Sequence, residues 1–217
     1  MQNKEIFNIN IPGEQPSKGC LLVAEPFLRE KWFNHAVIYM LDYEGVGESS
    51  MGIVLNHPTD TTLWEIFSEK APADSEVADL KVYCGGPVGT DRLYFLHTLG
   101  DTIIPGAQKL GAFKADNETV ALGNSLWIGG DFEAAKDYVR MGYPVDGHIR
   151  FFIGYSGWSP RQLNDEVDMK TWAVIPEGRS PQQLLKGDGD AVWHESVRHL
   201  GPAYRSWLLH PQEPWAN

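Results

Sequence analysis

Residues 154–163, which read Gly-Tyr-Ser-Gly-Trp-Ser-Pro-Arg-Gln-Leu, constrain the fold of this chain more than any other stretch. The apolar run 149–154 has the length and composition of a buried strand. We expect this strand to break on glycine and to re-enter a helix. Ser159, Pro160 and Gln162 have the spacing of an N-cap, a first-turn proline and the third residue of a capping box. Such an elbow between strand and helix is a frequent location for functional residues.

The rest of the chain alternates short apolar runs with Gly/Pro turns, and helical patterns gather in the last third. Only a few connections are long enough to carry a helix between parallel strands, so the pattern predicts an α+β fold with a mixed or mainly antiparallel sheet. Residues 70–79 and 101–118 are expected to be loops. Strands are predicted at 20–24, 36–41, 51–55, 80–84, 93–97, 120–128, 149–154 and 172–175, and helices at 27–33, 61–67, 132–140 and 191–209, the last broken at Gly201-Pro202.

The domain organisation is expected to be simple. Residues 1–18 are rich in Asn, Gln, Pro and Gly and predict an extended arm, and residues 19–217 predict a single domain. The hydrophobic content of 42% suffices for a core. The start of the chain has no apolar signal segment and no run approaches the length of a membrane span, so we expect a cytoplasmic protein.

The charge and the cysteines of the chain argue against two classes of protein: those that bind DNA directly and those that are stabilised by disulfides. The net charge is -11, and the sequence contains no cluster of basic residues. Both features argue against direct DNA binding, because DNA binding needs several cationic contacts to phosphate. Cys20 and Cys84 lie in apolar runs and are predicted to be buried free thiols. A redox pair on adjacent strands stays open as an alternative.

Three motif-like patterns fail on spacing. In Gly-Tyr-Ser-Gly the second glycine follows Ser156 directly, one position too early for a nucleophile elbow. His194 and His199 are five residues apart, whereas a zinc-protease helix needs a spacing of four. The run that begins at Asp188 lacks the glycine and glutamate of a calcium loop. We therefore predict no catalytic residues, no metal and no cofactor.

Polar residues at strand ends are the remaining candidates. Asn56, His57 and His97 are either caps of the strands or members of a site. The Gly85-Gly86-Pro87 segment is either a tight turn that needs positive φ or a backbone anion site. Trp158 stands beside the elbow.

Several motifs occur together and in a fixed order, and they resemble the AlgH/YqgE family of bacterial proteins. The resemblance covers about residues 17–175 and implies a compact α+β fold with a bifurcated sheet curled into a pseudo-barrel, in a cytoplasmic protein. Members are often labelled transcriptional regulators, and no catalytic residues can be carried over. The motifs are Ser17-Lys18-Gly19, Leu21-Leu22, Glu25-Pro26-Phe27-Leu28, Met51 to Pro58, Gly85-Gly86-Pro87-Val88, Leu96-His97, Gly154 to Trp158, Gln162-Leu163 and Glu166.

The chain departs from this family at three positions. His35 stands where the family usually has arginine, and His57 stands where it has lysine or arginine. Arg161 replaces a glycine at the start of the elbow helix. The two exchanges to histidine remove fixed positive charge, which further weakens an interaction with nucleic acid.

We hypothesise a non-enzymatic, regulatory protein that binds a protein partner through a surface centred on the elbow. The alternative is a small-molecule or catalytic site in the same place, with His97, His57 and Glu166 as acid/base candidates because proton transfer needs a group titrating near neutral pH. The candidate surface comprises Asn56, Gly85, Gly86, Pro87, His97, Tyr155, Trp158, Gln162 and Glu166.

Overall fold

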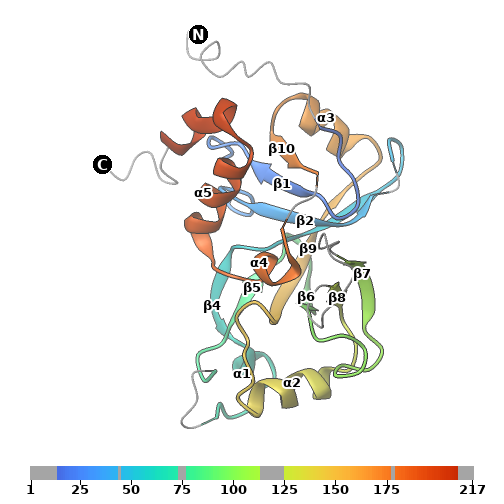
Figure 1. The fold of residues 1–217 in the computed structure, drawn as a ribbon, viewed down its shortest axis with the longest axis vertical. Helices are drawn as coiled ribbons and strands as arrows, with labels where there is room; N and C mark the ends of the chain where they lie inside the picture. Colours follow the sequence, from blue (N-terminus) through green and yellow to red (C-terminus); the bar gives the residue numbers. More distant parts are fainter. Residues whose placement is uncertain (1–13, 44, 73–76, 113–124, 177–178, 210–217) are drawn as a thin grey trace, which may run out of the picture. The chain divides into compact units, whose positions relative to one another are not determined.

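The structure is a computed structural model that describes residues 14–43, 45–72, 77–112, 125–176 and 179–209 (Figure 1). Most of the predicted arm, residues 1–13, and the first part of the strand predicted at 120–128 lie outside this range. The chain divides into two compact units. Unit 1 comprises Met1–Asn56, Gly157–Glu177 and Asp188–Asn217, and unit 2 comprises His57–Ser156 and Gly178–Gly187. The prediction of one domain over 19–217 stays a prediction.

Unit 1 is built on four antiparallel strands. Their order is β10 (Trp172–Ile175), β1 (Leu21–Ala24), β2 (Val37–Tyr43) and β3 (Ser50–Val54). Every residue of β1 and β10 is buried, as expected for strands that are covered on both faces. Helix α3 (Gln162–Asp168) packs Leu163 and Val167 into a core with Leu22, Ile38 and Met40.

Helix α5 (Gly189–His199) contacts β1 and β2 and buries Val192, Trp193 and Val197. The helix ends at the predicted break, and a 3₁₀ helix, Pro202–Leu209, follows Gly201. Proline interrupts the α-helical hydrogen-bond ladder there. The predicted start at 191 is two residues late, because Gly189 and Asp190 already belong to the first turn.

Unit 2 carries a mixed sheet in the order β4 (Pro58–Thr62), β5 (Lys81–Cys84), β9 (Ile149–Trp158), β6 (Val88–His97), β8 (Ser125–Ile128) and β7 (Gln108–Ala112). The β5–β9 pair is parallel and the other pairs are antiparallel. This arrangement agrees with the predicted mainly antiparallel sheet. The last residues of β9, Gly157 and Trp158, are counted with unit 1.

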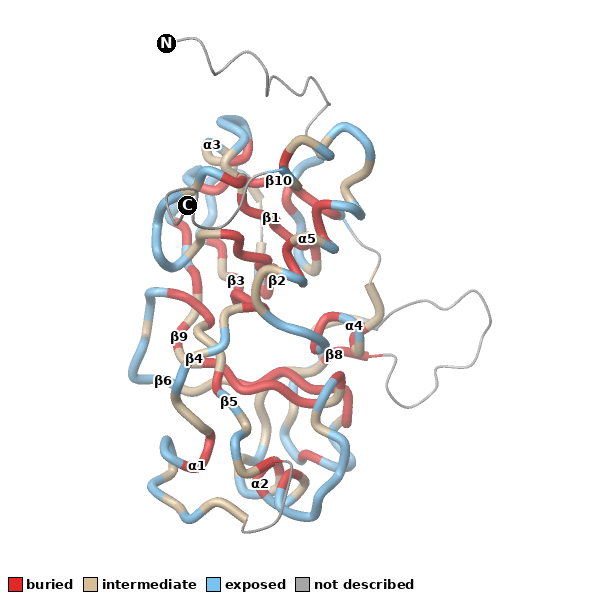
Figure 2. Tube along the Cα trace, turned by 90° about the vertical axis from the view of Figure 1, so that its left-hand side faces the viewer, coloured by how far each residue is buried: buried red, intermediate tan, exposed pale blue. Residues whose placement is uncertain are grey.

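The described part of unit 2 also contains three short helices, α1 (Leu63–Ile66), α2 (Phe132–Arg140) and α4 (Pro181–Leu184). Helix α2 has the predicted bounds because Asp131 caps it, accepting from the backbone N–H groups of Glu133 and Ala134 at 2.8 and 3.2 Å. Val139 of this helix shares a core with Trp64, Phe95 and Phe151. Figure 2 shows buried segments along the sheet and exposed segments along the outer turns of this unit.

Four predictions about secondary structure are wrong. Residues 27–33 form turns and not a helix. Strand β7 lies within the region predicted to be irregular. Strand β4 begins at Pro58, where no strand was predicted. The strand 149–154 does not break on glycine, because β9 continues through Gly154 and Gly157 to Trp158.

The predicted N-cap of the elbow helix is also wrong. Helix α3 begins after Arg161, which has a left-handed φ of 68° and makes no side-chain cap bond. Half of the capping box forms nevertheless, since Gln162 Oε1 accepts from Ser159 N at 3.1 Å and from Ser159 Oγ at 3.0 Å. These bonds stabilise a tight turn ahead of the helix.

No helix within the described ranges combines the length and the hydrophobicity that crossing a lipid bilayer requires.

Candidate functional site

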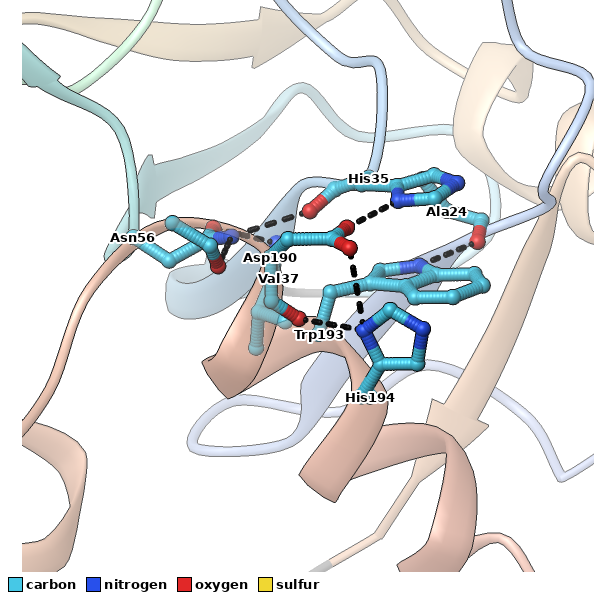
Figure 3. A network of polar contacts seen from close by, with 8 residues as sticks. Ala24, His35, Val37, Asn56, Asp190, Trp193 and His194 are labelled. Atoms are coloured by element: carbon cyan, nitrogen blue, oxygen red, sulfur yellow. Dashed lines mark hydrogen bonds and ion pairs between the residues drawn. The ribbon is translucent and has the colours of Figure 1, made fainter. Parts of the chain in front are cut away.

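Asp190, in the first turn of α5, is the centre of a polar network in unit 1 (Figure 3). Its Oδ1 pairs with Nδ1 of His35, and its Oδ2 lies 3.1 Å from Nδ1 of His194. An ionised carboxylate only accepts hydrogen bonds, so the Nδ1 atom of each histidine carries the proton in this arrangement. His194 Nδ1 also lies 2.9 Å from the backbone oxygen of Asp190. One carboxylate therefore orients two imidazoles.

Asn56 attaches the start of α5 to the sheet. Its Oδ1 accepts from Val37 N at 2.8 Å, and its Nδ2 donates to the backbone oxygens of His35 and Gly189, both at 2.9 Å. The backbone N–H of Gly189 donates to Asn56 O at 2.6 Å. Asn56 is 1% exposed. A buried amide with this set of partners fixes backbone geometry and has no group directed to solvent.

Trp193 completes the network. Its ring stacks on His35, and its Nε1 donates to Ala24 O at 2.9 Å. His35 is fully buried and has a φ of 51°, a left-handed conformation that costs a non-glycine residue about 1–2 kcal/mol. The pairing with Asp190, the stack and the Asn56 bond together hold His35 in this conformation.

The network fixes both ends of residues 25–34, which we call the 25–34 loop. Ala24 precedes the loop and His35 follows it. Inside the loop, Leu28 and Phe33 pack against the unit 1 core. Phe27 and Trp32 are partly exposed, at 44% and 41%. A loop with anchored ends and two partly exposed aromatic side chains has the character of a binding element on a rigid scaffold.

The chemistry open to the network depends on the groups beside its histidines. A His–Asp pair can activate a neighbouring hydroxyl or thiol, but the serine on the same helix, Ser196, is buried and donates to Val192 O at 2.8 Å. No three His, Cys, Asp or Glu side chains among the described residues are arranged to hold a metal ion. The geometry instead suits positioning of the 25–34 loop.

Comparison with known proteins identifies the relatives of this chain. The AlgH-like family model matches residues 21–205. The chain belongs to the AlgH-like family. A UPF0301 protein of Parabacteroides distasonis is 38% identical over 99% of this chain and 98% of its own length, and a UPF0301 protein of Bacteroides fragilis is 36% identical over the same shares.

Two solved structures are similar to this AlgH-like protein. A crystal structure of a protein from Corynebacterium diphtheriae has a TM-score of 0.67 at 19% identity and covers 95% of this chain and 98% of its own. The solution structure of AlgH from Pseudomonas aeruginosa has a TM-score of 0.59 at 23% identity and covers 87% and 93%. These matches show the fold alone. They confirm the predicted fold class, an α+β protein with a mainly antiparallel, curled sheet, whereas the predicted family is confirmed by the family model and the UPF0301 relatives.

Of the predicted surface, Trp158 and Gln162 both contact Glu166 in unit 1. Glu166 Oε2 accepts from Nε1 of Trp158 at 2.8 Å and from Nε1 of Trp172 at 2.7 Å. Its Oε1 accepts from Gln162 Nε2 at 2.9 Å. Glu166 Oε2 therefore joins α3 to two tryptophans of the core, while Oε1 is engaged by Gln162 of the same helix.

Gly85, Gly86 and Tyr155 meet in unit 2, where two backbone segments cross. A Cβ atom on Gly86 would lie 2.3 Å from the carbonyl carbon of Tyr155, and one on Gly154 would lie 2.5 Å from Gly86 O. Glycine is required here for close approach. Ser156 is fully buried and donates to Gly85 O at 3.2 Å. Pro87 is exposed beside the crossing.

His97 and His57 also belong to unit 2. His97 is buried, its Nε2 donates to Gly129 O at 3.1 Å, and its Nδ1 accepts from Leu99 N at 3.2 Å. Burial lowers the pKa of His97 to about 4, so the ring is neutral at pH 7. His57 is half-buried, and its backbone oxygen accepts from Cys84 N at 2.8 Å. That the nine predicted residues form a binding surface stays a prediction.

The two cysteines are free thiols. Cys20 precedes β1, whose partners are β10 and β2, whereas Cys84 ends β5, whose partners are β4 and β9. The alternative of a redox pair on adjacent strands is therefore wrong. Burial raises the pKa of the Cys20 thiol to about 11, which leaves it little thiolate character.

Sequence reasoning missed Asp190, Trp193 and the role of His194. The signal that could have found them is His35, where the chain departs from the usual arginine of the family. A buried histidine needs a polar partner, and Asp190 is an acidic residue at the start of a helix predicted to end the chain.

Proposed function

We propose that this AlgH-like protein is a non-enzymatic, cytoplasmic regulatory protein that binds a protein partner through the 25–34 loop. The observation that carries the proposal is the double anchoring of this loop by α5, which holds the exposed Phe27 and Trp32 on a fixed support. Aromatic anchors that are ordered before binding lose little conformational entropy on association, and tryptophan is over-represented among residues that dominate interfaces.

The state of two of the three acid/base candidates, Glu166 and His97, supports binding over catalysis. Glu166 accepts three hydrogen bonds through its two oxygens, and His97 uses both ring nitrogens in bonds to the backbone. Groups engaged in this way support the fold and are poorly placed to exchange protons with a substrate. The net charge of -11 speaks against DNA as the partner. It favours a protein with an apolar pocket and a basic rim.

The proposal is tested by placing a photo-crosslinking amino acid at position 32 and, as a control, at position 169. Met169 is also in unit 1 and is 69% exposed. We expect crosslinking to one defined protein in bacterial lysate from position 32 only. Capture of the same proteins from both positions contradicts the proposal.

The captured protein is then purified and its affinity measured by calorimetry. We expect Trp32→Ala to weaken binding by about 30-fold or more, the effect of losing an interface anchor worth about 2 kcal/mol. Met169→Ala is expected to leave the affinity unchanged. Both variants should unfold at the wild-type urea concentration, because both side chains are exposed. Equal affinity of Trp32→Ala and the wild type contradicts the proposal.

A further inference from the structure

Unit 2 contains a pocket of about 750 Å³ that plays no part in the proposed partner binding. It lies among β5, the start of β9, the segment 142–146 and Leu185. Its volume falls within the range of about 300–1,000 Å³ typical of small-molecule sites. Its lining includes Lys81, Tyr83, Tyr143, Val145, Asp146 and Arg150.

The walls are held by contacts that exist without a ligand. Tyr143 stacks on Tyr138 with ring centroids 5.1 Å apart, and the Tyr138 hydroxyl donates to Pro144 O at 2.9 Å. On the other side, Gly147 N donates to Leu185 O at 3.2 Å. The segment 142–146 is thus attached to both α2 and the region after α4, so a ligand meets a preformed wall.

Most of the lining is apolar or aromatic. Ile149 and Leu185 are buried, Val77 and Leu80 add aliphatic surface, and the rings of Tyr83 and Tyr143 are flat. Val77 is fixed through its backbone oxygen, which accepts from Trp64 Nε1 at 2.8 Å. Such walls favour the flat, apolar body of a small organic molecule.

The charged residues of the lining determine which sign of ligand charge the pocket favours. Arg150 is 6% exposed, its guanidinium carbon lies 4.2 Å from the centre of the Tyr83 ring, and its Nη2 donates to Leu185 O and Gly187 O, both at 2.8 Å. Lys81 is exposed, and its ammonium group donates to Asp60 O at 3.0 Å. Asp146 is the acidic residue of the lining. Among the lining residues, two cations stand against one carboxylate, so the lining itself carries a net positive charge within an acidic protein.

We propose that this pocket binds a small organic anion with a flat apolar body, such as an aromatic carboxylate. The apolar walls contact the ring system of the ligand, and Lys81 contacts its carboxylate. Arg150, whose guanidinium lies against the Tyr83 ring, contributes positive charge. Asp146 excludes ligands with a second negative charge. The site is independent of the 25–34 loop, so either proposal can fail without the other.

The test is calorimetric titration of the full chain with 1-naphthoate as the probe. 1-Naphthamide and 1-naphthylmethylammonium share the ring system and are neutral and cationic. We expect saturable binding of naphthoate at one site per chain and at least about tenfold weaker binding of the other two, the usual effect of losing a charged hydrogen bond. Equal binding of the three compounds, or no naphthoate binding at millimolar concentration, overturns the proposal.

Two variants locate the site. Lys81→Met removes the charge from an exposed side chain and should weaken naphthoate binding about tenfold, whereas Lys109→Met, an exposed lysine of unit 2 outside the pocket, should leave it unchanged. Val145→Trp fills the cavity and should remove binding. Arg150 is not substituted, because its side chain also donates hydrogen bonds to two backbone oxygens.

Amide chemical shifts provide a readout that does not depend on the variants. On addition of naphthoate to the wild type, the largest changes should fall at residues 80–83 and 142–150. Largest changes elsewhere, or unaltered affinity in both Lys81→Met and Val145→Trp, overturn the proposal. Correct folding of each variant is checked by the dispersion of the same spectra.

Discussion

Trp193 lies flat against His35, with the ring centroids 3.7 Å apart and the ring planes inclined by 5°. Because the same indole donates to Ala24 O, one side chain of α5 contacts the residues on both sides of the 25–34 loop. The order of the loop therefore depends on a helix that is about 160 residues away in the sequence, through stacking and hydrogen bonding of ordinary strength.

Trp193→Phe separates these two contacts. Phenylalanine keeps an aromatic ring beside His35 but leaves Ala24 O without its indole donor, so we expect a loss of about 1–2 kcal/mol in the free energy of unfolding. Hydrogen exchange should accelerate at residues 25–34 and stay unchanged in β3. Uniform acceleration across both segments would show that Trp193 supports the whole of unit 1 and has no special effect on the loop.

Glu166→Ala tests the tryptophan bridge. The substitution leaves the Nε1 groups of Trp158 and Trp172 without their acceptor, and we expect it to lower the free energy of unfolding by about 2–4 kcal/mol in urea titration. Asp168→Ala, an exposed position on the same helix, is the control and should change stability little. Similar effects of the two substitutions would contradict a bridging role for Glu166.

Gly154→Ala tests the backbone crossing in unit 2. Gly154 and Gly142 have nearly the same φ, 71° and 74°, but a Cβ atom meets Gly86 O at 2.5 Å in the first case and nothing within 4 Å in the second. We expect Gly142→Ala to cost about 1 kcal/mol, the conformational penalty alone. Gly154→Ala should cost about 3 kcal/mol or more, or prevent folding, because backbone must move. Thermal unfolding of both variants measures the difference.

His97 makes the fold sensitive to acid. Its pKa falls from 6.5 to about 4 on burial, so between these values the unfolded chain binds a proton that the folded chain does not. The stabilisation from neutral His97 is complete above pH 6.5 and declines as the pH falls toward 4, by up to about 3 kcal/mol.

His97→Gln removes this titration while keeping a donor for Gly129 O. Urea unfolding of the two proteins across this pH range should show a shallower decline of stability on acidification in the variant. A decline of the same steepness would mean that other groups account for the acid sensitivity.

Local signals in the sequence predicted several elements well. Asp131 followed by an amphipathic stretch fixed the bounds of α2, and the four apolar residues of β10 were found because a fully buried strand has a continuous apolar run. Thr62 and Glu65 form the capping box of α1.

The predictions that failed have one physical cause in common. In each case the contact that determines the structure joins residues that are distant in the sequence. The glycine at 154 was expected to end a strand, yet it marks the approach of Gly86 to a strand that continues. His35 and Asp190 are 155 positions apart, so no local pattern could join them. Likewise, the pocket of unit 2 is lined by Leu185 together with residues of β5 and β9.

The pairing of β1 with β10 has a consequence during synthesis. Leu21 leaves the ribosome early, but its partner Ile175 follows about 150 residues later, or roughly 10–30 s at usual elongation rates. Over that interval β1 can pair with β2, while its other edge, four apolar residues long, has no strand beside it. An open apolar edge readily pairs with another chain, so the nascent protein is most prone to aggregation before residue 175 emerges and most dependent then on the chaperones that meet it at the exit tunnel.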